Sequence, residues 1–171
     1  GSNSKTMKFT EEILKQIKYV ILDADSLNSF QNKTKKLLKY LDRNKLITPH
    51  QAEFHRLFPA IKKSLNNKEK VLKFLNLCKS NILLKGNTTV IGSSGKIVIN
   101  RHTSSELAVI GSGDVLAGII ASLVGDKKMS ISEAASAATW LHGDIAKRYG
   151  KGLISEDLVK GIPDALRRLK K

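Results

Sequence analysis

The sequence predicts an α/β layered fold built around a mainly parallel sheet. Short apolar segments with the composition of buried strands alternate with longer segments whose apolar residues recur at helical spacing. Such alternation is typical of strand–helix–strand units, in which helices cover the sheet. The length of 171 residues suits one domain, so residues 1–171 are expected to form a single one.

The predicted elements follow one another with short connections. Pro49 ends the second strand because proline lacks the N–H that the ladder needs. A Ser94-Gly95 turn predicts that the last two strands form a hairpin. In order, the expected elements are a helix before residue 19, a strand over 19–22, a helix over 33–43, a strand over 46–48, helices over 53–58 and 68–79, strands over 82–85, 89–92 and 97–99, and helices over 113–123, 130–149 and 155–169.

Serines are expected to cap the last two helices. A serine side chain just before a helix can accept a hydrogen bond from a first-turn N–H. Either Ser130 or Ser132 is in place to cap the helix over 130–149. Ser155 is expected to cap the last helix, where Asp157 in the first turn would favour the helix dipole.

The formal charge is +15, but its distribution argues against a nucleic-acid-binding protein. The charge comes mostly from lysines scattered from Lys5 to Lys171, and lysine lacks the planar fork with which arginine reads bases. Aromatic residues make up 5% of the chain, which leaves little surface for base stacking. We therefore expect solvated lysines and no nucleic-acid partner, in a field that would also favour an anionic small molecule.

The sequence also bears on the compartment. No apolar run approaches the roughly 20 residues of a membrane span, so no membrane partner is expected. Cys78 is the only cysteine, and it falls on the apolar face of a predicted helix, where a buried thiol is expected rather than a nucleophile. A single cysteine cannot form an internal disulfide, which fits a reducing compartment and predicts a cytoplasmic protein.

Polar and glycine-rich segments follow several of the predicted strands. In parallel α/β sheets, ligands bind at the carboxyl ends of the strands. The sequence therefore predicts a ligand site where these segments converge. The segments are Asp23-Ala24-Asp25, Thr48-Pro49-His50, Lys85-Gly86 and Gly111-Ser112-Gly113-Asp114.

The segment Gly111-Ser112-Gly113-Asp114 opens a strongly apolar helix. Its glycines allow a tight turn, and the free first-turn amides, together with the helix dipole, can hold an anion. A carboxylate beside that anion suits a general base that takes a proton from an attacking hydroxyl, which is the role expected of Asp114. The alternative is an ordinary helix start, in which Asp114 only favours the dipole.

The residues after the first three strands each have two interpretations. Lys85 and Gly86 could hold nucleotide phosphates or form an ordinary loop. His50 and Glu53 could contact substrate and hold a magnesium ion through water, or they could form a capping box. The polar side chains of Asp23-Ala24-Asp25-Ser26-Leu27-Asn28 could line a pocket or only form a turn.

These segments occur in the order and with the spacing of one family. The sequence resembles the ADP-dependent NAD(P)H-hydrate dehydratases, whose fold is ribokinase-like, from about Phe9 to the C-terminus. Five linked motifs carry the resemblance and are more specific together than any one alone. They are Asp23-Ala24-Asp25-Ser26-Leu27-Asn28, Thr48-Pro49-His50-Gln51-Ala52-Glu53-Phe54, Leu84-Lys85-Gly86-Asn87-Thr88-Thr89-Val90-Ile91, Gly111-Ser112-Gly113-Asp114-Val115-Leu116-Ala117-Gly118-Ile119 and Trp140-Leu141-His142-Gly143.

The resemblance implies a lyase that repairs NADH and NADPH whose nicotinamide ring has been hydrated. Such enzymes phosphorylate the ring hydroxyl with ADP (ATP in some relatives) and Mg²⁺, and then release phosphate. Asp114 matches the residue that contacts and deprotonates the hydroxyl. With the strand-end positions, the resemblance gives a nucleotide site of Lys85, Gly86, Asn87, Thr88, Thr89, Gly111, Ser112 and Gly113, a substrate site of His50, Asp25, Asn28 and Asp114, and a magnesium contact through water at Glu53.

The chain departs from the family pattern in several places. Thr103-Ser104-Ser105 stands where the family usually has Gly-Asn-Pro, Val109-Ile110 replaces Thr-Ala, and Gln51-Ala52 replaces Pro-Gly. A complete domain of the family has further strands and helices before the Phe9 segment, including a glycine-rich substrate loop. The N-terminal portion is therefore expected to be missing, and the expected partner is a second copy or a complementing N-terminal segment.

Two alternative functions stay open at this point. A ribokinase-like kinase for a vitamin precursor would share the fold and the Gly-x-Gly-Asp loop. An inactive, truncated domain that only binds nucleotide would share the motifs without the turnover.

Overall fold

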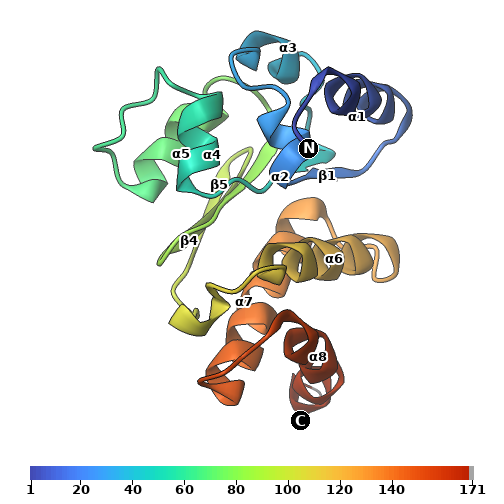
Figure 1. Ribbon diagram of the computed structural model, residues 1–171, viewed down its shortest axis with the longest axis vertical. Helices are drawn as coiled ribbons and strands as arrows, with labels where there is room; N and C mark the ends of the chain where they lie inside the picture. The colour runs from blue at the N-terminus through green and yellow to red at the C-terminus, as the bar shows by residue number, and fades with distance from the viewer. Residues whose placement is uncertain (170–171) are drawn as a thin grey trace. The chain divides into compact units, whose positions relative to one another are not determined.

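The computed structural model describes residues 1–169 (Figure 1). The chain divides into two compact units, one over Gly1–Ile99 and one that begins at Asn100. In Figure 1 the first unit runs from blue to green and the second from yellow to red. The assignment of the whole chain to a single domain stays a prediction.

The order of elements follows the alternation expected from the sequence. The first unit contains α1 (Ser4–Gln16), β1 (Val20–Leu22), α2 (Ala24–Asn28), α3 (Thr34–Leu38), β2 (Lys45–Ile47), α4 (Gln51–Leu57), α5 (Asn67–Leu75), β3 (Asn81–Leu84), β4 (Thr89–Ser93) and all but the last residue of β5 (Lys96–Asn100). The second unit contains the short 3₁₀ helix η1 (Ser105–Leu107), α6 (Ser112–Gly125), α7 (Ile131–Tyr149) and α8 (Ser155–Leu169).

The strands form one five-stranded sheet in the order β1-β2-β3-β4-β5. β1 pairs with β2 and β2 with β3 in parallel, whereas β4 runs antiparallel to β3. The register places Val20 opposite Lys45, and Ile47 opposite Ile82. The parallel part of the sheet confirms the α/β prediction, and β4 and β5 are neighbours, as the predicted hairpin requires.

The core of the first unit lies between this sheet and its helices. The apolar residues of β2 and β3 are fully buried, which explains why their sequences are continuous apolar runs without alternation. α5 packs against β3 and β4. The contact is so close at Gly92 that a Cβ there would lie 2.3 Å from Cγ1 of Val71. Glycine is therefore required at this position of β4.

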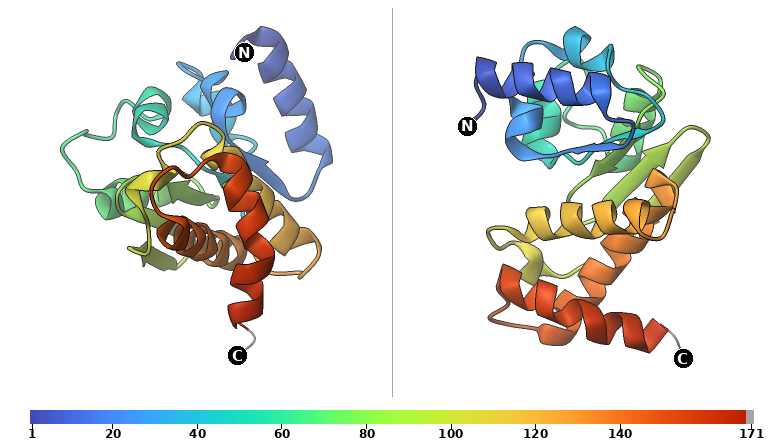
Figure 2. Two further views of the ribbon diagram at one scale, coloured as in Figure 1. Left: turned by 60° about the horizontal axis from the view of Figure 1, so that its bottom comes forward. Right: turned by 90° about the vertical axis from the view of Figure 1, so that its right-hand side faces the viewer.

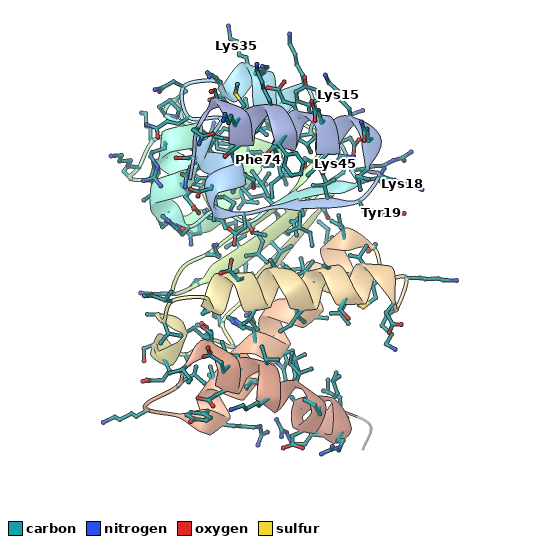
Figure 3. The ribbon with its side chains drawn as sticks, turned by 45° about the vertical axis from the view of Figure 1, so that its right-hand side comes forward. Lys15, Lys18, Tyr19, Lys35, Lys45 and Phe74 are labelled. Carbon is teal, nitrogen blue, oxygen red and sulfur yellow. The ribbon has the colours of Figure 1, made fainter. Side chains whose placement is uncertain are left out.

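Lys45 is a buried cation at the start of β2. Its ammonium group donates hydrogen bonds to the carbonyl oxygens of Ile17 (2.9 Å) and Lys18 (2.8 Å), which precede β1. In Figure 3, Lys45 lies inside the unit, whereas Lys15 and Lys35 point away from it. Most lysines are exposed in this way, in agreement with the expected solvated faces. Among residues 1–169, no helix combines the length and the apolarity needed to cross a membrane.

Two predicted helices in the first unit are shorter in the structure. The helix expected over 33–43 is α3 and ends at Leu38, and the chain turns at Asp42 after Leu41 has entered the core. The Asp42 side chain accepts a hydrogen bond from the N–H of Asn44 at 2.7 Å, a local turn that competes with the helix. The helix expected over 68–79 ends at Leu75.

Cys78 therefore does not lie on a helix face, and that prediction was wrong. It is half-buried in the segment that follows α5, where it packs against the core. Burial raises the pKa of the Cys78 thiol, although a hydrogen bond from the backbone at Ser80 opposes the effect. A thiol with a raised pKa is a weak nucleophile, so the interpretation as a structural cysteine stands.

In the second unit, α7 packs against α6 and α8, and Figure 2 shows α8 against α7 in both views. Ser130 caps α7 in a capping box with Glu133, which selects Ser130 over Ser132. Ser155 does not cap α8, contrary to the prediction. Its hydroxyl donates to the carbonyl oxygen of Ile110, while Asp157 accepts a hydrogen bond from the N–H of Ile154 at 3.2 Å.

Asp144 is a buried carboxylate that joins three segments of the second unit. It accepts hydrogen bonds from Arg148 of α7 (3.0 Å) and Arg168 of α8 (2.9 Å), and it lies 3.4 Å from Nε2 of His102. Burial raises the pKa of Asp144, but the hydrogen bonds from Arg168 and Arg148 outweigh burial and hold the pKa below its ordinary value. The ionised carboxylate of Asp144, which belongs to α7, thus binds Arg168 of α8 and stabilises the contact between the two helices.

Asp144→Asn should lower the free energy of unfolding by about 1–2 kcal/mol at neutral pH, a modest value because both arginines are partly solvated. A lowered folded pKa gives a stabilisation that is present above the unfolded pKa of about 3.9 and lost as pH falls through the folded value. The gap between the variant and wild type should therefore close below about pH 4 in urea titrations. The control is Asp164→Asn, because Asp164 forms an exposed pair with Arg167. A gap that stays constant down to acid pH would contradict this role for Asp144.

Candidate functional site

An ion pair joins the carboxyl ends of β1 and β3. Nζ of Lys85 lies 2.8 Å from Oδ1 of Asp23, and both side chains are largely buried, with 22% and 14% of their surfaces exposed. The N–H of Lys85 donates to the carbonyl oxygen of Pro49 at 2.9 Å, and His50 and Lys85 form a parallel bridge beyond the end of β2. The three strands thus bring Asp23, His50 and Lys85 together at one edge of the sheet, as the sequence predicted for that edge.

The sequence placed Asp23 in a segment that could line a pocket, but the substrate contacts predicted from that segment were Asp25 and Asn28. The structure shows that Asp23 is the acid that meets Lys85, whereas Asp25 is exposed and pairs with the amino group of Gly1 at 3.2 Å. The residue after Asp23, Ala24, has φ of 47°, a strained left-handed conformation for a residue other than glycine. Asp23 directly follows β1, and its place at a strand end was the signal that could have singled it out.

His50 and Glu53 form the capping box that the sequence left as an alternative. Nδ1 of His50 accepts hydrogen bonds from the N–H groups of Ala52 (3.1 Å) and Glu53 (3.4 Å). The Glu53 carboxylate accepts from the N–H of His50 at 2.9 Å. His50 is therefore the N-cap of α4, yet its side chain is 51% exposed, so the ring edge is accessible to a ligand as well.

Glu53 is buried and links the cap to α2. Its second oxygen accepts a hydrogen bond from Nδ2 of Asn28 at 3.4 Å, and Oδ1 of Asn28 accepts one from Arg56 at 3.1 Å. Both carboxylate oxygens of Glu53 thus have protein partners. No group of three metal-ligating side chains occurs in the described part of the chain, and a magnesium contact through water at Glu53 stays a prediction.

The loop from Lys85 to Thr89 connects β3 to β4 with a defined conformation. The hydroxyl of Thr89 donates to the carbonyl oxygen of Gly86 at 3.3 Å, which closes the loop on itself. The side chain of Asn67, from the first turn of α5, donates to the carbonyl oxygen of Thr88 at 2.8 Å. The predicted nucleotide residues of this segment therefore lie on a fixed loop at the same end of β3 as the ion pair.

In the second unit, Gly111 starts α6 in the left-handed conformation, with φ of 82°. A Cβ on Gly111 would lie 3.0 Å from the hydroxyl of Ser155, so both backbone conformation and space favour glycine. The N–H groups of the first helical turn have no intrahelical acceptors. That of Ser112 donates to the carbonyl oxygen of Val109 at 3.3 Å, which leaves those of Gly113 and Asp114 for an anion.

Asp114 lies in this first turn with an exposed side chain. Its carboxylate makes no hydrogen bond or ion pair with other residues of the described range. An exposed carboxylate beside free amides can accept a proton from a hydroxyl that attacks a bound phosphoryl group. Of the sequence-predicted site, the first unit thus holds His50, Glu53, Asn28 and the Lys85–Thr89 loop, and the second unit holds Gly111 to Asp114.

Comparisons with known proteins agree with these motifs. The family model described as NAD(P)H-hydrate dehydratase matches residues 1–163. The bifunctional NAD(P)H-hydrate repair enzyme Nnr of Archaeoglobus fulgidus is 34% identical over 173 residues, which cover 99% of this chain and 34% of the relative. The ADP-dependent (S)-NAD(P)H-hydrate dehydratase of Neisseria meningitidis is 37% identical over 134 residues, 75% of this chain and 45% of the relative. The chain therefore spans between a third and a half of these relatives' lengths.

Solved structures share the fold. A ribokinase-like superfamily protein from Enterococcus faecalis superposes with a TM-score of 0.84 at 22% identity, over 98% of this chain and 60% of the other. The ADP/ATP-dependent NAD(P)H-hydrate dehydratase of Bacillus subtilis, co-crystallised with ATP and Mg²⁺, gives a TM-score of 0.70 at 24% identity, over 92% of this chain and 59% of the other. The expected ribokinase-like fold is thereby confirmed.

The capping role of His50 can be separated from any contact with a ligand. His50→Ala should lower the free energy of unfolding by about 0.5–2 kcal/mol, because the first-turn N–H groups of α4 lose their acceptor. His50→Asn should stay close to wild type, since asparagine is a preferred N-cap. Urea denaturation of both variants measures the difference. Equal losses in the two variants would show that the imidazole itself, rather than the cap, stabilises this end of α4.

Proposed function

Because the chain belongs to the NAD(P)H-hydrate dehydratase family, we propose that it carries out the ADP-dependent dehydration of hydrated NADH and NADPH. The observation that carries the proposal is the start of α6. There, the free amides of Gly113 and Asp114 and the exposed Asp114 carboxylate provide an anion site and a proton acceptor side by side. Phosphorylation of a hydroxyl group needs both.

In the proposed reaction, the oxygen of the ring hydroxyl forms a bond to the terminal phosphorus of ADP. The bond from that phosphorus to the bridging oxygen breaks, and AMP leaves with those electrons. The Asp114 carboxylate takes the hydroxyl proton, and the amides of the α6 N-terminus stabilise the charge on the transferred group. Phosphate then departs with the electrons of the ring C–O bond while the neighbouring ring carbon loses a proton to water, which restores the reduced nicotinamide.

The first unit is proposed to hold the adenine nucleotide and part of the substrate. The Lys85–Thr89 loop matches the family's nucleotide segment, and the Lys85 ammonium would neutralise phosphate charge. The exposed ring of His50 and the fixed amide of Asn28 are proposed substrate contacts. Mg²⁺ would supply further neutralisation of the phosphates, with Glu53 as a contact through water. A second copy or a complementing segment remains the proposed partner.

Binding and product assays test the proposal. ADP at 100 times its dissociation constant should stabilise the chain by roughly 2.7 kcal/mol, seen as a rise in melting temperature. Incubation of hydrated NADH with ADP and Mg²⁺ should release free phosphate together with reduced nicotinamide absorbance. Accumulation of a phosphorylated alcohol from a vitamin precursor would instead establish the kinase alternative. A melting curve unmoved by ADP, with no product in either assay, would refute a nucleotide site in this chain.

Asp114→Asn tests the general base, because it keeps the shape of the side chain and removes the proton acceptor. Turnover should fall by roughly 10²–10⁴-fold, the usual contribution of a positioned base, which is about 2.7–5.4 kcal/mol of barrier. ADP should bind as well or slightly better, since one negative charge near the phosphates is gone. Asp126→Asn is the control, since Asp126 is an exposed acid that follows α6. Retained turnover with a lowered melting temperature would leave Asp114 as a helix-dipole residue only.

A further inference from the structure

Side chains from α4 and α5 donate hydrogen bonds to the backbone of the Lys85–Thr89 loop. Nε2 of Gln51, the first residue of α4, lies 3.4 Å from the carbonyl oxygen of Lys85 and 2.9 Å from Oδ1 of Asn67. Nδ2 of Asn67, the first residue of α5, donates to the carbonyl oxygen of Thr88 at 2.8 Å. Carbonyl oxygens at the start and near the end of the loop are thus bound by the same pair of amide side chains.

Lys70 fixes the direction of this hydrogen-bonded chain. Its ammonium group is a donor only, it is 6% exposed, and it lies 2.9 Å from Oε1 of Gln51. The oxygen of the Gln51 amide must therefore face Lys70, and its NH₂ group must face the two acceptors. Asn67 then accepts through its oxygen and can only donate to Thr88. The buried ammonium group of Lys70 thus sets the orientation of both amides, so that the NH₂ groups of Gln51 and Asn67 donate toward the loop.

The middle of the loop also lies on this support. A Cβ on Gly86 would be 3.1 Å from Nδ2 of Asn67 and 3.7 Å from Nε2 of Gln51. The loop backbone at Gly86 therefore approaches the Asn67 amide more closely than most residues with a side chain would allow, whereas its distance to the Gln51 amide is an ordinary contact. Hydrogen bonds at two carbonyl groups and this close approach together restrict the loop to one path.

We propose that Gln51, Asn67 and Lys70 are positioning residues that preorganise the Lys85–Thr89 loop for an adenine nucleotide. The inference rests on the proposed function for the identity of the ligand, but the support itself is independent of it. A loop held in one conformation before binding loses less entropy when the ligand arrives, so its affinity is higher. Gln51 supplies a side-chain donor that the proline expected at this position from the family resemblance would lack.

Two substitutions remove the donors and keep the helices. Gln51→Glu keeps an oxygen for the Lys70 ammonium, removes the NH₂ donors to Lys85 and Asn67, and places an acid in the first turn of α4, where the helix dipole favours it. Asn67→Asp keeps the acceptor for Gln51, removes the donor to Thr88, and puts an acid in the first turn of α5, where the helix dipole favours it. Asn66→Asp is the matched control, because it adds the same charge one residue earlier and keeps the cap of α5.

Hydrogen exchange of the loop amides and calorimetric titration with ADP are the measurements. In Gln51→Glu and Asn67→Asp, the Lys85 amide, which donates to the carbonyl oxygen of Pro49, should exchange about tenfold faster without nucleotide, and the dissociation constant for ADP should rise about tenfold, the scale of a lost hydrogen bond to a buried group. Asn66→Asp should match wild type in both.

The outcomes separate the inference from the proposed function. Unchanged loop exchange in both variants would overturn the support, whether or not the chain binds ADP. Faster exchange with an unchanged dissociation constant would overturn its role in nucleotide affinity. A wild-type chain that binds no ADP, while the variants still exchange faster, would overturn the proposed nucleotide ligand and leave the support of the loop in place.

Discussion

The parallel pairing of β1, β2 and β3 determines where the polar groups of the first unit meet. Parallel strands end at the same edge, so residues far apart in sequence become neighbours there. Asp23 and Lys85 are separated by 62 positions and yet form a 2.8 Å ion pair, with His50 bridged to Lys85 beside them. A slip of one residue in this register would turn Lys85 to the other face of the sheet and break the pair. The capping of α4 and the path of the Lys85–Thr89 loop both depend on that edge.

Most of the remaining candidate residues lie at the first turns of helices. The unpaired N–H groups of a first turn can serve the fold or bind a ligand. Free first-turn N–H groups need acceptors, which a side chain or a bound anion can supply. At α4 the acceptor is the imidazole of His50, and the helix is satisfied from within the chain. At α6 the N-cap is Gly111, which has no side chain, so the amides of Gly113 and Asp114 stay open. This difference, rather than any motif, separates a closed helix start from one that can receive a phosphate group.

Hydrophobic periodicity and strand-end position were enough to predict the α/β class, the five strands and the edge where the site residues gather. Pattern alone was insufficient where a local polar interaction decided the outcome. The Asp42 turn shortened α3, and the hydroxyl of Ser155 bonded Ile110 rather than capping α8. The strand-end position marks Asp23 as a candidate, but Asp25 is also an acid after the same strand, and only the fold shows that Asp23 is the one that pairs with Lys85. Buried lysines 45 and 70 were unexpected for a similar reason, since lysine is usually solvated and only the acceptors around each ammonium group explain its burial.

Gln51 occupies a helix position where the family resemblance leads us to expect proline, and its side chain makes contacts that proline could not make. Proline at the first position of a helix stabilises the fold by about 0.4–1 kcal/mol, largely by restricting the unfolded chain. Glutamine gives up that restriction, but its amide binds Lys70 on one side and Asn67 and Lys85 on the other. A buried ammonium group without an oxygen partner would be strongly unfavourable. Lys70 and Gln51 are therefore best understood as a pair, in which the cation requires the amide oxygen and the amide nitrogen is thereby turned toward the loop.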